Sequence, residues 1–303
     1  MDWGLEIASD AIRICRAGLR RERAEIRLLD EVPVDRGLIR PSLKETNLPN
    51  TPALADLLRQ QARRLGCRGW VRLALPDPLF LLRTVATDEL PADPAAARQF
   101  LGWQLRDQLP FPAEEARLDF LPTGPATDGR LRVTCLIGRT RVLSEYEALL
   151  ERAGLRAAVI DAHSVALAQS ASAFLAAKTV ALLSAAGGHA TLLMVQEGRP
   201  RLWRILPLDP ASGGDGAVRL IREVADSLTF FRESEGVGPP KQVFVHGGKP
   251  WASETAAALA DWLESPVSIL DLGGVVPPNG ASPDVSGDLG RWGAAVGAAI
   301  RPC

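Results

Sequence analysis

The sequence predicts an α/β fold made of two copies of one unit, in which a three-stranded meander is followed by a helix, a strand and a helix. Short apolar or alternating runs of strand length come in groups of three, joined by tight turns. Each group is followed by segments whose apolar residues recur at helical spacing. Strands and helices in this order form mixed sheets with helices packed on their faces.

The first copy is divided into two parts of the sequence, residues 3–75 and 155–176. We predict its strands at 3–7, 11–17, 24–29, 71–75 and 155–160, and its helices at 52–65 and 164–176. Gly66 follows the first helix as a C-cap. Asp161 or His163 would cap the second helix.

An additional segment interrupts the first copy. Its predicted strands are 79–85, 116–121 and 131–137, and its predicted helices are 94–109 and 141–152. Asp93 is an expected N-cap, because Pro94 suits the first helical position. The second copy has predicted strands at 180–183, 190–196, 200–207, 242–246 and 267–270, helices at 216–233 and 254–263, a loop at 273–287 and a last helix at 288–300.

Composition sets limits on location and partners. The chain has 303 residues, enough for two domains, and its net charge of -1 gives no general attraction to nucleic acid or anionic lipid. Arginines do gather near the amino terminus, and we interpret them as a solvated hairpin: Arg13, Arg16, Arg20, Arg21, Arg23 and Arg27. No apolar run is long enough for a signal peptide or a membrane helix, so we expect a soluble cytoplasmic protein.

Neither the cysteines nor the histidines have metal-site spacing. The cysteines lie far apart in sequence, and we expect Cys15, Cys67 and Cys135 to be small core residues in a reducing compartment. His163, His189 and His246 form no HxxxH pair. The sequence therefore predicts no metal centre.

Several segments resemble the actin-like fold and, within it, the type IV pilus assembly protein PilM family. The most specific is RQFLGWQLRDQLPFPAEEARLDF at 98–120. Supporting runs are ALPDPLFLLRTV at 74–85, GLRAAVIDAHSVALA at 154–168 and DSLTFFRES at 226–234. The resemblance covers nearly the whole chain.

The resemblance implies duplicated actin-like, ribonuclease H-like domains with an inserted subdomain in the first and a reduced helical subdomain in the second. Domain I would comprise 1–76, 154–176 and 288–303. The inserted subdomain would be 77–153, and domain II would be 177–287. A nucleotide site would lie between domains I and II.

The resemblance also implies which residues would form that site: Glu6, Ser9, Gly187, Gly188, Gly247 and Gly248. Three parts of the site depart from the family pattern, and a fourth is kept. Glu6-Ile7-Ala8-Ser9-Asp10 stands where an Asp-Ile-Gly turn is usual, and Ser184 stands in place of the second acidic residue. The turn after His246 keeps its glycines, whereas only residues 208–215 remain where the family has a helical subdomain. We therefore expect no cofactor and no enzymatic activity, with ATP and Mg²⁺ as the possible ligands if the site is used.

The function implied by the resemblance is that of a scaffold in type IV pilus or related type II secretion assembly. The chain would dock the cytoplasmic N-terminal peptide of a bitopic inner-membrane protein of the PilN type, and could contact the assembly motor ATPase. We predict apolar anchors for that peptide at Leu81, Phe100, Trp103 and Phe111. The secretion-system relative with the same fold carries a membrane helix after its actin-like part. This sequence has no such helix, so we expect the pilus type, which is a separate protein without a membrane helix.

Two other functions remain open. One is an active ATPase or ATP-gated switch that uses Glu6 and a second carboxylate, for which Asp161 is the candidate. The other is a relative of the sugar and acetate kinases, which the absent phosphate motifs disfavour.

Overall fold

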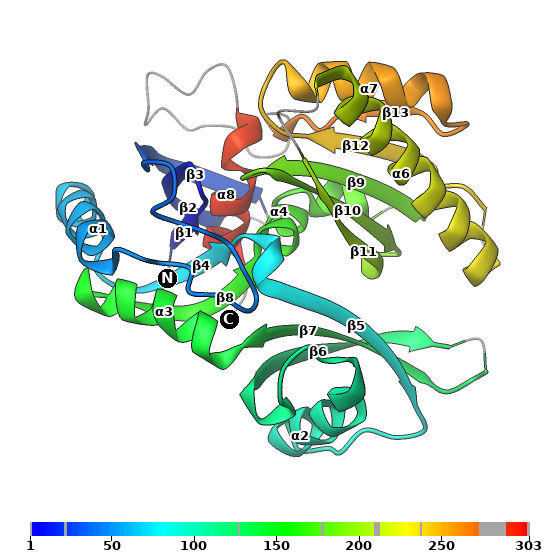
Figure 1. Ribbon diagram of the computed structural model, residues 1–303, viewed down its shortest axis with the longest axis horizontal. Coiled ribbons are helices and arrows are strands. Elements are labelled where there is room, and N and C mark those ends of the chain that lie inside the picture. Colours follow the sequence, from blue (N-terminus) through cyan, green and yellow to red (C-terminus); the bar gives the residue numbers. More distant parts are fainter. Residues whose placement is uncertain are drawn as a thin grey trace.

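The computed structural model describes residues 2–20, 23–126, 128–176, 179–208, 213–236, 238–272 and 289–301. Its described part contains three sheets, and Figure 1 shows two of them in the upper part of the molecule with the third below. The predicted loop at 273–287 and Cys303 lie outside the described residues.

The first sheet contains the amino terminus. Its strands are β1 (Trp3–Ile7), β2 (Ala11–Arg20), β3 (Arg23–Pro33), β4 (Gly69–Leu75) and β8 (Leu155–Ala162), in the order β3-β2-β1-β4-β8. β1, β4 and β8 run parallel, whereas β2 is antiparallel to both of its neighbours. β8 is an edge strand, so one side of its backbone has no partner strand.

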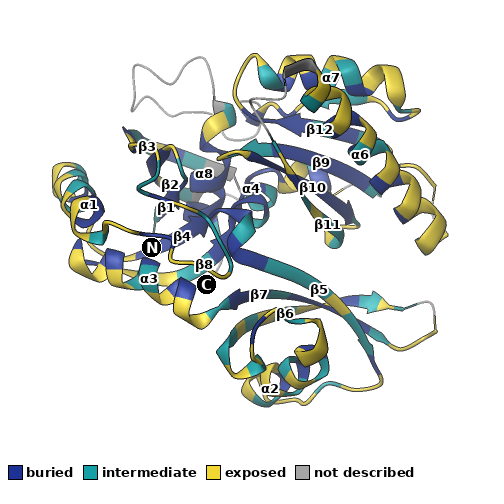
Figure 2. Ribbon diagram, in the orientation of Figure 1, coloured by how far each residue is buried: buried dark blue, intermediate teal, exposed yellow. Residues whose placement is uncertain are grey.

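Helices cover both faces of this sheet. Leu73 and Leu75 of β4 pack in one core with α1 (Thr51–Leu65) and α3 (Thr140–Arg152). Ala74 points to the other face, toward α4 (His163–Ser170) and α8 (Gly293–Ile300). β4 is therefore buried on both sides, and Figure 2 colours most of this strand as buried.

The second sheet repeats the first. It contains β9 (Thr179–Ala186), β10 (His189–Gln196), β11 (Arg199–Pro207), β12 (Gln242–His246) and β13 (Val267–Ile269), in the order β11-β10-β9-β12-β13. α6 (Gly213–Glu235) and α7 (Trp251–Trp262) pack on it. Because the two strand orders match position by position, the predicted duplication is confirmed. β11 ends at Pro207 and α6 begins at Gly213, which leaves no room for a helical subdomain between them.

The inserted segment forms the third sheet. β5 (Phe80–Thr87), β7 (Leu131–Arg139) and β6 (Ala116–Pro125) lie in the order β5-β7-β6, with α2 (Pro94–Leu105) on one face. Its connection to the first sheet is a short 3₁₀ turn at Asp77–Leu79. The domain boundaries assigned above remain a prediction.

Local signals located the end of α1 and the start of α2. Asp93 Oδ2 accepts a hydrogen bond from Ala96 N over 2.7 Å, and Gly66 adopts the left-handed conformation after α1. The predicted cap at Asp161 or His163 is wrong, because Ala162 is the N-cap residue of α4 and makes no side-chain cap bond. The predicted helix 164–176 is divided at Ala171 into α4 and α5 (Ser172–Leu175).

Glycines allow α8 to pack against its neighbours at very short range. A Cβ on Gly4 would lie 2.1 Å from Ala295 O, and one on Gly297 would lie 1.7 Å from Ala166 O. α8 therefore fits between β1 and α4 only because these positions lack side chains. Among the described residues, no helix is long and apolar enough to cross a membrane.

Candidate functional site

A cavity of about 310 Å³ lies between the first and second sheets. Its walls come from the β1–β2 hairpin, the start of α4, the β9–β10 turn and the segment after β12. The lining residues are Glu6, Asp10, Arg13, His163, Ala185, Ala186, Gly187, Gly188, His246, Gly247, Gly248 and Arg291.

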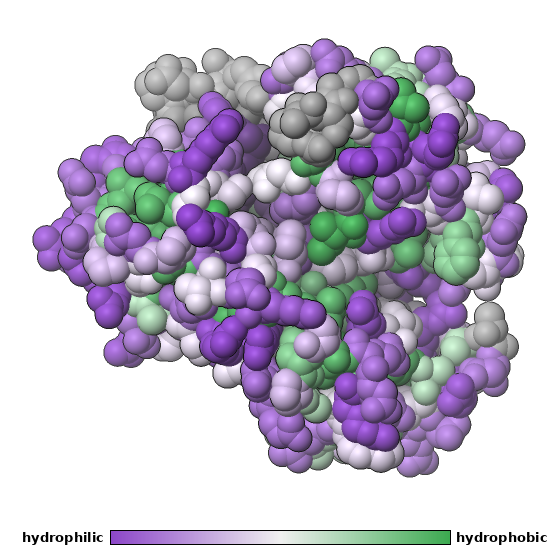
Figure 3. Space-filling model, viewed as in Figure 1, coloured by the Kyte–Doolittle hydropathy of each residue, from purple (hydrophilic) through white to green (hydrophobic). Residues whose placement is uncertain are grey.

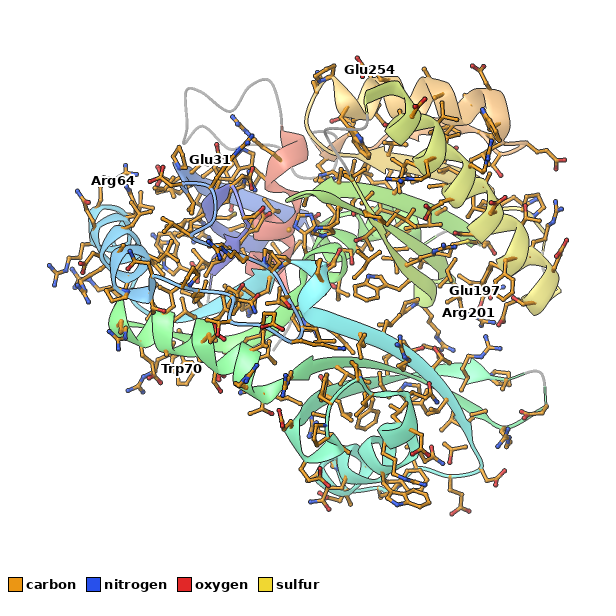
Figure 4. All side chains as sticks on the ribbon, viewed as in Figure 1. Glu31, Arg64, Trp70, Glu197, Arg201 and Glu254 are labelled. Atoms are coloured by element: carbon orange, nitrogen blue, oxygen red, sulfur yellow. The ribbon has the colours of Figure 1, made fainter. Side chains whose placement is uncertain are left out.

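Arg13 is the central charge of this cavity. Its Nη1 donates to Glu6 Oε1 over 3.2 Å, its Nη2 to Asp10 Oδ2 over 3.2 Å and its Nε to Glu31 Oε2 over 2.7 Å. Glu6 is 1% exposed, so its charge depends on such partners. Arg291 also pairs with Glu31 over 3.3 Å, and Figure 4 shows Glu31 on β3, an edge strand of the first sheet. One guanidinium is thus shared by three carboxylates, and His163 and Arg291 supply the further positive charge beside Glu6 and Glu31.

His163 is the second partner of Glu6. Its Nδ1 lies 3.1 Å from Glu6 Oε1. Burial alone would raise the pKa of Glu6, but His163, and then Arg13, lower it below its ordinary value. Burial alone would lower the pKa of His163, but Glu6 raises it above its ordinary value. The pair therefore favours a charged carboxylate and a charged imidazolium.

His246 behaves in the opposite way. Burial, together with the charge of His163, lowers its pKa to about 3, so its imidazole is neutral near pH 7. Several buried polar atoms around the cavity have no hydrogen-bond partner in the described structure, among them Glu6 Oε2, His163 Nε2 and His189 Nε2. No group of three or more His, Cys, Asp or Glu side chains in the described ranges could hold a metal ion.

The two hairpin turns touch each other. A Cβ on Gly187, which has a φ of 57°, would lie 2.7 Å from Ser9 Oγ. The space left beside this contact is about 10 Å³, room for no more than a water molecule. The turns that would cradle phosphates in an actin-like ATPase are therefore in direct contact here.

Asp77 joins the two sheets behind the cavity. Its Oδ1 accepts from Ser164 N over 2.9 Å and from Ser164 Oγ over 3.0 Å, and its Oδ2 accepts from Thr191 Oγ1 over 2.6 Å. Trp203 Nε1 donates to Ser164 Oγ over 2.7 Å. Asp77 therefore caps the N-terminus of α4 in place of a neighbouring residue, and it also links α4 to β10.

The structure brings the six predicted nucleotide-site residues together. Glu6 and the glycines at 187, 188, 247 and 248 line the cavity, and Ser9 lines the small space beside it. Whether nucleotide binds there stays a prediction.

A larger groove, of about 700 Å³, lies between the third sheet and the first. Its two long sides are edge strands: β6 closes one sheet and β8 closes the other. Apolar side chains at its floor include Phe80, Leu82 and Leu136, and hydrophobic side chains gather where the lower subdomain meets the upper sheets in Figure 3. Charged pairs stand around it, with Arg117 bound to Glu147 over 2.6 Å and Arg98 to Asp119 over 3.2 Å.

The four predicted peptide anchors do not line this groove. Leu81 and Phe100 pack on the opposite side of the third sheet, in the core under α2, and Phe111 is 7% exposed in the same core. Strand alternation explains the difference, because Phe80 and Leu82 face the groove while Leu81 faces α2. Trp103 is 62% exposed and stacks under Arg106, with the guanidinium carbon 4.5 Å from the ring centroid.

Asp161 also lies away from the cavity. It is buried beside the groove, where it pairs with Arg301. Burial raises its pKa despite the attraction of Arg301. The carboxylate that we considered for an active ATPase is therefore part of the groove wall.

Sequence reasoning missed the roles of Arg13 and His163 in the cavity and of Asp77 behind it. Arg13 could have been found, because the β1–β2 register places it opposite Glu6. His163 and Asp77 reach their partners across 157 and 87 residues of sequence, and no local pattern indicates such contacts.

The comparisons with known proteins agree with this fold. The family model for the type IV pilus assembly protein PilM matches residues 4–199. A solved structure titled as a PilM–PilN type IV pilus biogenesis complex superposes with a TM-score of 0.85 at 21% identity, covering 99% of this chain and 98% of that chain. A Bacteroides thetaiotaomicron protein of unknown function with an actin-like ATPase fold superposes with a TM-score of 0.53 at 9% identity, covering 90% and 91%. At these identities the superpositions show the actin-like fold. A search of curated proteins found no match.

Proposed function

The chain belongs to the type IV pilus assembly protein PilM family, and on that premise we propose that it is an assembly adaptor that holds a peptide of a membrane partner in the β6–β8 groove. The observation that carries this proposal is the groove itself. It has a volume of about 700 Å³, it has an apolar floor, and it lies between two edge strands.

An extended peptide fits these features well. Edge strands present unpaired N–H and C=O groups, which an added strand satisfies, while alternate side chains enter the apolar floor. A few such anchors give micromolar affinity, about -8 kcal/mol. The charged pairs Arg98–Asp119 and Arg117–Glu147 would then form the polar rim around the peptide.

The partner in this proposal is a bitopic inner-membrane protein of the PilN type, which would contribute its cytoplasmic N-terminal segment. The similar solved structure is titled as a complex with PilN, which supports this choice. The chain would then work in the cytoplasm, held at the inner membrane by that partner, and could also contact the assembly motor ATPase. Residues 77–153 would be the subdomain that forms one wall of the groove.

We further propose that the cavity between the sheets does not hydrolyse ATP. Arg13 pairs with Glu6, Asp10 and Glu31, so each of these carboxylates has a cationic partner without a metal ion. The contact between Ser9 and Gly187 reduces the space between the two hairpin turns to about 10 Å³, which disfavours phosphates there. A nucleotide-gated switch is the second candidate, favoured by the 310 Å³ cavity and its glycine turns.

The decisive experiment is calorimetric titration with the N-terminal peptide of the PilN-type protein. Ala158→Arg should abolish binding, because exposed Ala158 of β8 lines the groove and a long charged side chain would fill it. Trp103→Ala is the matched control and should bind as wild type does. If wild type binds no such peptide, the adaptor proposal fails. If Trp103→Ala weakens binding and Ala158→Arg does not, the groove is the wrong site.

Nucleotide binding is tested by thermal melting with ATP and Mg²⁺. A ligand at 100 times its Kd stabilises a protein by about 2.7 kcal/mol, which is readily measured. No shift is expected. A shift that Glu6→Gln removes would favour the switch instead.

A further inference from the structure

Arginines concentrate at the end of the first sheet where its parallel strands begin. α1 and α3 both end there, because each leads directly into a parallel strand, β4 or β8. A cavity of about 350 Å³ lies between the helix ends. Four of its lining residues are arginines, Arg59, Arg63, Arg68 and Arg152, and one is a glutamate, Glu151.

One of these arginines has a role within the fold. Arg59 donates through Nε to Arg152 O over 3.1 Å, at the last residue of α3, and pairs with Asp56 over 2.5 Å. It therefore holds the ends of the two helices together.

The other three arginines have no side-chain partner among the described residues. Arg63, Arg68 and Arg152 are exposed, and their side chains form no ion pair or hydrogen bond with the described part of the chain. These three guanidiniums outnumber Glu151, the carboxylate that lines the same cavity, and an external anion would relieve their remaining repulsion.

A second feature extends this basic surface. Trp70 at the start of β4 pairs in register with Arg156 at the start of β8, and the guanidinium carbon lies 5.8 Å from the ring centroid. Trp70 is 50% exposed. Arg64 and Trp70 both lie on the side of the molecule formed by α1 and the end of α3 (Figure 4).

The helix dipole does not account for this arrangement. Cations in the last turn stabilise a helix end, which explains Arg63 and Arg152 in part. Arg68 and Arg156 lie on the strand side of each turn, beyond the helices, where that stabilisation falls away.

We propose that this basic end, defined by Arg63, Arg68, Arg152, Arg156 and Trp70, is a docking surface for the anionic phospholipid headgroups of a membrane. Guanidiniums bind phosphate oxygens in a bidentate manner, and a half-exposed tryptophan suits the headgroup region. The arginines surround one end of a domain and do not follow a line across its surface. This arrangement fits contact with a planar membrane surface.

The position of the groove supports the same orientation. Arg156 directly precedes Ala157, the first β8 residue that lines the groove. A peptide that leaves the groove at this end would emerge beside the basic surface. This last argument rests on the proposed adaptor function, whereas the charge and exposure arguments do not.

The test is co-sedimentation of the full chain with vesicles, without any peptide. Wild type should bind vesicles that contain phosphatidylglycerol and should not bind vesicles of phosphatidylcholine alone. Each arginine at an anionic surface contributes roughly fivefold to partitioning, so Arg63→Gln/Arg68→Gln/Arg152→Gln should bind roughly 100-fold more weakly. Binding should also fall in 0.5 M salt, at which the screening length is roughly 4 Å.

The matched control is Arg219→Gln/Arg222→Gln/Arg232→Gln, which removes the same charge from exposed arginines of α6. It should bind as wild type does. The proposal is overturned if wild type ignores anionic vesicles, if both triple variants lose binding equally, or if inorganic phosphate at millimolar concentration releases the protein completely. Peptide titration of the same variants separates this result from the adaptor proposal, because the basic-end variant should still bind peptide.

Discussion

Replacing Arg13 with methionine is the sharpest test of the charge-balanced cavity. The substitution keeps most of the apolar stem and removes the guanidinium from three carboxylates. Glu6, at 1% exposure, would keep only His163 as a charged partner. Removing one member of a buried ion pair costs about 3–5 kcal/mol, because the remaining charge stays buried and uncompensated.

We expect the lower end of that range, about 3 kcal/mol, because His163 remains and Glu31 is partly exposed to water. Thermal melting should show a decrease of roughly 6 °C, at about 2 °C per kcal/mol for a chain of this size. The loss should shrink as the pH falls below the ordinary range of a carboxyl group, because a protonated Glu6 needs no cation.

Two further variants make the experiment conclusive. Arg13→Met/Glu6→Gln should lose about 2 kcal/mol less stability than the sum of the losses of the two single variants. Arg27→Met removes an exposed arginine that pairs with Asp2 over 3.4 Å, and should change stability by less than about 0.5 kcal/mol. Equal losses for Arg13→Met and Arg27→Met, or additive effects of the Arg13 and Glu6 changes, would refute the reasoning.

Three other predictions concern His246, Asp77 and Gly297. The folded pKa of His246, about 3, lies below the unfolded value of 6.5, so stability is complete above pH 6.5 and declines below it. His246→Gln should therefore lose about 2 kcal/mol less than wild type between pH 7 and pH 5 in urea titrations, and identical pH profiles would contradict this. Asp77→Ala should cost about 3 kcal/mol, because Ser164 and Thr191 lose their buried acceptor, whereas a change under 1 kcal/mol would exclude a clamp between the sheets. Gly297→Val should give little folded protein on expression, because its Cβ would overlap Ala166 O, and a stable variant would mean that α8 can shift.

The sequence by itself was sufficient for the architecture. Strand and helix periodicity, with short turns, located both meanders and the inserted segment, because side-chain period follows directly from backbone geometry. Asp93 and Gly66 identified helix ends for the same local reason, since a cap involves residues three or four apart. Motifs at 98–120 led to the family that the comparisons confirm.

Only the tertiary structure decided which residues contact one another in the cavity and in the groove. The capping of α4 by Asp77 depends on a partner 87 residues away, so the local prediction of Asp161 or His163 was wrong. The residues that line the groove depend on which face of β5 and β6 meets the first sheet. Alternation along a strand defines two faces, but it does not predict which of them packs under α2. Charge balance at Glu6 likewise required three segments to converge, because the energy of a buried charge is set by its neighbours in space and not by its neighbours in the chain.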